Sequence, residues 1–156
     1  MGTKPTHEQA QLHLQVYDLR REARLRQARD WFQQNYRADT MEEAMKLAAP
    51  GTEAGINCGM VMGYWEQACA LLNKGLLDED LFFETSGEFF MVWELLKPVA
   101  DQFRQAFKDP TMLKNLQTAA ERFEAWKEQR APGNIAAMRE WMQQERANAK
   151  SAAAAS

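Results

Sequence analysis

The chain has 156 residues, of which 46% are hydrophobic and 26% charged, so its composition is that of a globular domain and excludes a fibrous or wholly disordered protein. The formal net charge of −3 argues against a nucleic-acid partner, because phosphate contacts require a concentrated excess of Lys and Arg. Charged residues interrupt every apolar run before it reaches the roughly 18 residues of a membrane span, and two unpaired cysteines fit a reducing compartment, so we expect a soluble, cytoplasmic protein.

The first predicted element is a long amphipathic helix over residues 7–36, a range without Gly or Pro in which apolar side chains recur at helical spacing. Five arginines lie in its middle: Arg20, Arg21, Arg24, Arg26 and Arg29. One interpretation is a basic patch for RNA or an acidic lipid surface. The acidic residues three or four positions away favour the other interpretation, which is a ladder of ion pairs on a solvated helix face.

Caps and helix breakers divide the rest of the chain into further helices. The two longest cover residues 53–74 and 87–108 and carry most of the large apolar side chains, so we expect them to form a central helical hairpin. Pro98 should bend the second one, because its ring clashes with the carbonyl group one turn earlier. The other helices are expected to begin at their N-cap residues Thr40, Asp78, Asp109 and Asn134.

No segment shows the alternating pattern of a strand, so the predicted fold class is all-α, a compact bundle of about six to seven helices. Residues 6–147 are expected to form one domain. Residues 1–5 and the tail at 148–156, which is low in complexity, are expected to be flexible.

Three glycines of the first central helix, Gly55, Gly59 and Gly63, are spaced four residues apart. Each costs up to about 1 kcal/mol relative to Ala inside a helix, so something should offset that cost. Such a stripe lets a second helix backbone approach closely, either in the core or across a dimer interface. The alternative is that Gly55 and even Gly59 belong to a loop that precedes the helix.

Residue patterns that carry chemistry are sparse. Asp80, Glu84 and Glu88 lie four residues apart and could together bind a metal, but a di-iron bundle site also needs Glu-x-x-His pairs, which the sequence lacks. Cys58 and Cys69 have no histidine near them in sequence, and no glycine-rich phosphate-binding motif is present. We therefore predict no catalytic residue, no metal and no cofactor.

Three stretches resemble a known family: YWE at residues 64–66, LNKGLLDEDL at residues 72–81 and WELLKP at residues 93–98. Together they look like the bacterial DUF4760-type proteins of unknown function, and the resemblance covers roughly residues 17–126. It implies an α-helical domain, which in some members is attached to membrane helices. It implies no activity and no functional residue.

The leading hypothesis is a non-enzymatic cytoplasmic helical domain that acts by protein contact, with a homodimer as the favoured assembly. The alternative is a small-ligand-binding protein or enzyme with a pocket between the two central helices, each of which carries a Trp-Glu pair. The candidate pocket or interface residues are Gly59, Gly63, Trp65, Glu66, Trp93, Glu94 and Lys97.

Overall fold

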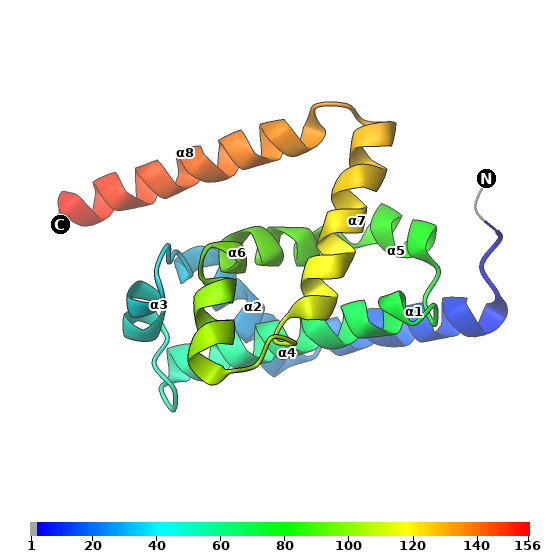
Figure 1. The fold of residues 1–156 in the computed structure, drawn as a ribbon, viewed down its shortest axis with the longest axis horizontal. Coiled ribbons are helices and arrows are strands. Elements are labelled where there is room, and N and C mark those ends of the chain that lie inside the picture. Colours follow the sequence, from blue (N-terminus) through cyan, green and yellow to red (C-terminus); the bar gives the residue numbers. More distant parts are fainter. Residues whose placement is uncertain (1–2) are drawn as a thin grey trace. The chain divides into compact units, whose positions relative to one another are not determined.

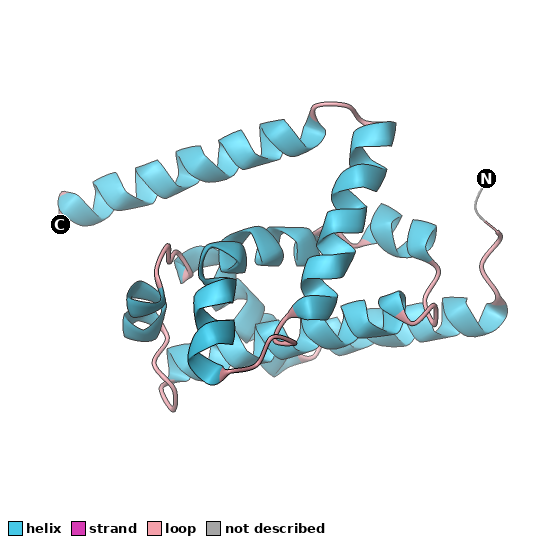
Figure 2. Ribbon diagram, viewed as in Figure 1, coloured by secondary structure: helices cyan, strands magenta, loops and turns pink. Residues whose placement is uncertain are grey.

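The computed structural model describes residues 3–156, and within that range it contains eight α-helices and no strand (Figures 1 and 2). The helices are α1 (His7–Arg20), α2 (Ala23–Asn35), α3 (Met41–Leu47), α4 (Glu53–Asn73), α5 (Glu79–Thr85), α6 (Glu88–Phe107), α7 (Lys114–Arg130) and α8 (Asn134–Ala154). The all-α class is confirmed, and the predicted count of six to seven helices is too low. None of the described helices has the length and apolar character needed to cross a membrane.

The additional helix arises because the predicted helix over residues 7–36 is in fact two helices, α1 and α2. The Glu22 carboxylate accepts hydrogen bonds from the backbone N–H groups of Arg24 at 2.9 Å and Leu25 at 2.8 Å, and so caps the N-terminus of α2. Glutamate is an unusual N-cap, and Glu22 is also well placed for an ion pair within one continuous helix. Helical spacing alone therefore could not locate this break.

The two predicted central helices agree with α4 and α6 to within one residue at each end. Between them, Gly75 adopts a φ of 73°, and the Asp78 carboxylate accepts a hydrogen bond from Leu81 N–H to cap α5. Trp65 of α4 and Phe89 of α6 are buried with their ring centroids 6.2 Å apart. The α6 ribbon changes direction partway along its length (Figure 1), and Pro98 occupies the middle of this helix.

Two predicted helix starts are wrong. The α7 helix begins at Lys114 instead of directly after Asp109, because the Asp109 carboxylate bonds to Thr111 N–H in a turn and Leu113 has a φ of 57°. Similarly, the N-cap of α8 is Gly133, in the left-handed conformation, and not Asn134.

The chain divides into two compact units, residues 1–120 and residues 121–156. The second unit has its own contacts: the Arg139 guanidinium donates to both carboxylate oxygens of Glu124 at 2.8 and 2.7 Å, and Arg130 lies 4.2 Å from the centre of the Trp126 ring. Residues 1–2 of the expected flexible N-terminus lie outside the described range. The expected domain over 6–147 and the expected flexible ends remain predictions.

Candidate functional site

An apolar pocket of about 260 Å³ lies in the first unit, between α3, α4, the second half of α6 and the connection to α7. Sixteen residues line it, and none of them is charged. The short helix α3 is held in place at its first residue, because Met41 N–H donates to the Gln102 side chain of α6 at 2.8 Å. The pocket is thus bounded by elements that are distant in sequence.

Gly55 shapes one wall of this pocket. A Cβ atom at Gly55 would lie 2.1 Å from the carbonyl oxygen of Ala49, so only glycine lets the α3–α4 connection run this close to α4. All three glycines of the stripe lie inside α4, so the alternative that placed Gly55 and even Gly59 in a preceding loop is wrong. The close contact is made with a loop of the same chain and not with another helix.

Gly59 and Gly63 differ from Gly55, because a Cβ atom added at either position would meet no atom within 4 Å. Both glycines are exposed, and Gly59 also lines the apolar pocket. The neighbouring Ile56 is 49% exposed, a high value for a large aliphatic side chain. We call Ile56, Gly59 and Gly63 the exposed face of α4.

Four sulfur-containing side chains contribute to the pocket wall. They are Met45, Cys58, Met62 and Met112. Burial raises the pKa of the Cys58 thiol to about 11, so the group stays protonated near neutral pH and is a poor nucleophile. The pocket therefore offers an adaptable apolar surface instead of a reactive thiolate.

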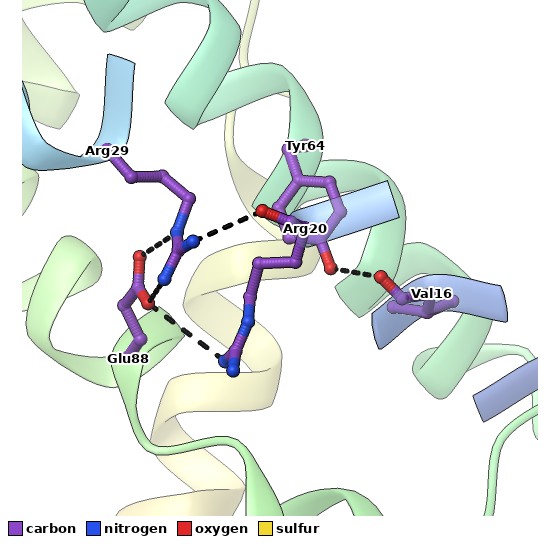
Figure 3. A network of polar contacts seen from close by, with 5 residues as sticks. All are labelled: Val16, Arg20, Arg29, Tyr64 and Glu88. Carbon is purple, nitrogen blue, oxygen red and sulfur yellow. Dashed lines mark hydrogen bonds and ion pairs between the residues drawn. The ribbon is translucent and has the colours of Figure 1, made fainter. Parts of the chain in front are cut away.

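A cluster of polar side chains joins α1, α2, α4 and α6 at a different place in the first unit (Figure 3). The Arg29 guanidinium donates to both carboxylate oxygens of Glu88, with Nε at 2.7 Å, and Arg20 lies 4.0 Å from the same carboxylate. The bond to Glu88 raises the pKa of Arg29. Arg29 was predicted to belong to a solvated ladder within its own helix; instead it forms a part-buried pair with α6.

The Tyr64 hydroxyl completes this polar cluster by donating to the backbone carbonyl of Val16 at 2.6 Å. Burial raises the pKa of Tyr64 to about 12, so the hydroxyl stays protonated near neutral pH and cannot act as a base. The Tyr64 hydroxyl donates its proton to a carbonyl of α1, and the Glu88 carboxylate is paired with Arg20 and Arg29. Within residues 3–156, no group of three or more His, Cys, Asp or Glu side chains is placed to hold a metal ion. The geometry of the cluster suits a structural role.

The predicted site residues fall in separate places. Glu66 accepts hydrogen bonds from Asn115 N–H at 3.1 Å, Asn115 Nδ2 at 3.0 Å and Leu116 N–H at 2.8 Å, so it caps α7 from a different helix. Trp65 is 1% exposed, and its ring forms a T-shaped pair with the Tyr64 ring at a centroid distance of 4.8 Å.

Three further predicted site residues, Trp93, Glu94 and Lys97, lie on α6. Trp93 is buried beneath the Arg104 guanidinium, which is 5.9 Å from the ring centre. Lys97 pairs with Glu94 at 3.9 Å on the same helix. Of the seven candidate residues, Gly59 is the one that lines the apolar pocket. The other pocket residues were missed, because nothing in the local sequence shows that α3 and the connection to α7 meet beside α4.

Comparison with known proteins gives one positive result. The family described as a domain of unknown function (DUF4760) matches residues 5–123, which is most of the chain. Neither the curated proteins nor the solved structures contain a match. The matched range spans the apolar pocket and the polar cluster and ends within α7. The chain belongs to the DUF4760 family, as the stretches at residues 64–66, 72–81 and 93–98 indicated.

Proposed function

We propose that this chain is a non-enzymatic cytoplasmic domain that acts by protein contact, and that it forms a homodimer through the exposed face of α4. The observation that carries the proposal is the open backbone at Gly59 and Gly63 beside the half-exposed Ile56. In the single chain, these two glycines weaken the helix without relieving any close contact. A second helix backbone packed on this face would offset that cost, because only glycine permits so close an approach.

The polar groups of the first unit support a non-enzymatic role. The Tyr64 hydroxyl, the Arg29 guanidinium and the Glu88 carboxylate are engaged in bonds within the protein. The buried Cys58 thiol has a pKa of about 11, far from the value that suits nucleophilic catalysis near neutral pH. These groups hold helices together. The exposed face of α4, in contrast, carries open glycine backbone beside Ile56.

Sedimentation velocity over a wide range of protein concentrations tests this proposal. We expect a concentration-dependent dimer for the natural sequence and a monomer for Gly63→Leu, whose side chain would block close approach of a second helix. The monomer should remain folded, because the new side chain has open space around it and removes a helix-weakening glycine.

The matched control is Gly87→Leu, at an exposed glycine outside α4 where an added Cβ also meets nothing within 4 Å. This variant should dimerise like the natural sequence. A natural chain that stays monomeric at millimolar concentration, or a Gly63→Leu variant that dimerises as well as the control, would overturn the proposal.

A further inference from the structure

We infer that the apolar pocket between α3, α4 and α6 binds a single unbranched aliphatic chain of about ten carbon atoms, with its polar end at the opening. The inference goes beyond the proposed dimer, since it concerns a ligand in the pocket that Gly59 lines and not the contact between two chains. It rests on the size of the pocket, on the chemistry of its wall and on the position of Gly59.

The size of the pocket limits the ligand. A protein cavity of about 150 Å³ accommodates benzene, and pockets for drug-sized ligands begin at about 300 Å³. The present pocket, at about 260 Å³, lies between these two values. Scaling from the six carbons of benzene gives room for about ten carbon atoms. A single alkyl chain fits this volume, whereas a two-chain lipid or a large polycyclic molecule exceeds it.

The chemistry of the wall excludes a charged group inside the pocket. No charged side chain lines it, so a buried carboxylate or ammonium group would have no partner and would be strongly disfavoured. The Cys58 thiol is itself uncharged near neutral pH, because burial raises its pKa. The buried part of the ligand must therefore be apolar, with its polar end at the opening.

The side chains of the wall favour a flexible chain over a flat ring. Met45, Met62 and Met112 are unbranched and adapt to irregular shapes. Three aromatic side chains belong to the wall, and all three already stack on other rings. Tyr36 stacks on Phe32 at 4.7 Å, and Phe103 and Phe107 stack on each other at 6.0 Å. An aromatic ligand would compete with these contacts, while an aliphatic chain can fill the space beside them.

Titration calorimetry with straight-chain alcohols of six to fourteen carbons tests the inference on the full chain. Each added methylene should tighten binding about fourfold while it is buried, and the gain should stop at about ten carbons. Naphthalene, which has ten carbon atoms in a flat ring system, serves as the comparison ligand and should bind more weakly than decanol.

Gly59→Leu and Gly63→Leu form a matched pair on the same helix. An added side chain has open space at both positions, but only Gly59 lines the pocket. The four side-chain carbons of Gly59→Leu should fill part of the pocket and move the chain-length limit from about ten carbons to about six. Gly63→Leu should leave that limit unchanged, even if it abolishes the dimer.

Three results would overturn the inference: no saturable binding of any alcohol, affinity that keeps rising up to fourteen carbons, or the same chain-length limit in both variants. A failed dimer would affect only the sedimentation result, and a failed alkyl site would affect only the calorimetry. The two proposals are therefore tested separately.

Discussion

The two halves of α4 show how one helix can be fixed at one end and open at the other. In the C-terminal half, residues 64–73, successive turns are bonded to other elements. Tyr64 bonds to α1, Glu66 caps α7, and Asn73 Nδ2 donates to the backbone and side-chain oxygens of Asn115. This half carries side chains that hold the helices together.

The N-terminal half, residues 53–63, contacts α2 on one side through the 2.7 Å bond from Arg24 to the buried Asn57. Its other side has exposed glycine backbone and borders the apolar pocket. The exposed backbone and the apolar pocket leave room on this side for a partner or a ligand. The difference between the halves is thus our reason for placing binding at the N-terminal end.

The largest effect is expected from the fixed half, at Glu66. Replacing it with Ala removes three hydrogen bonds and leaves the first N–H groups of α7 without their cap. We expect the free energy of unfolding to fall by about 3 kcal/mol, measured by urea denaturation. Glu66→Gln keeps one acceptor oxygen and should cost less than half as much. A loss below about 1 kcal/mol for Glu66→Ala would show that this cap contributes little to stability.

The glycines of the open half should respond to alanine with opposite signs. Gly55→Ala places a methyl group 2.1 Å from the Ala49 carbonyl oxygen and should destabilise the protein by about 1–3 kcal/mol. Gly63→Ala adds a methyl group to open space and should stabilise the monomer by up to about 1 kcal/mol. Thermal unfolding at low protein concentration measures both effects. Destabilisation by Gly63→Ala under those conditions would contradict this expectation.

A helix boundary was predictable from the sequence where the residue that sets it lies close to that boundary in the chain. The end of α4 and the start of α5 followed from the sequence because Gly75 and Asp78 act on residues within one turn of themselves. The start of α7 did not, because its cap, Glu66, lies about fifty residues earlier in the chain. The sequence offered Asp109 as a local cap, and Asp109 forms a turn instead.

The candidate site was less predictable than the fold. The sequence indicated tryptophans and glutamates as possible ligand-binding groups. In the structure, Trp65 is packed in the core and Glu66 caps α7. The apolar pocket is built from Met, Ala and Phe side chains that look like ordinary core residues in a sequence. Gly59 was the usable signal, because a glycine inside an apolar helix has a cost that calls for an explanation.

A smaller effect is expected where the fixed half of α4 meets α1. Tyr64→Phe removes the hydrogen bond to the Val16 carbonyl and should destabilise the protein by about 1 kcal/mol near neutral pH. Because the folded pKa of Tyr64 is about 12, against 10.0 for the free side chain, the unfolded state loses this proton first. Stability should therefore fall as the pH rises from 10 toward 12, and this part of the fall should be absent in Tyr64→Phe. An identical alkaline slope in both proteins would assign it to other groups.

The smallest effect concerns Glu22, which separates α1, bonded to the fixed half of α4, from α2, bonded to the open half. Hydrogen bonds from the backbone of Arg24 and Leu25 lower the pKa of Glu22 in the folded state. The unfolded state therefore takes up this proton first as the pH falls, so the contribution of Glu22 is present above its unfolded pKa and is lost in acid. Glu22→Gln keeps an acceptor oxygen for the cap and should change stability little at neutral pH. It should reduce the fall of the unfolding free energy in acid, measured by urea denaturation across the acid range.

Hydrogen bonds from Thr111 likewise lower the pKa of Asp109, so Asp109→Asn is the matched control. If only Asp109→Asn reduces the slope, the break between α1 and α2 does not depend on the charge of Glu22.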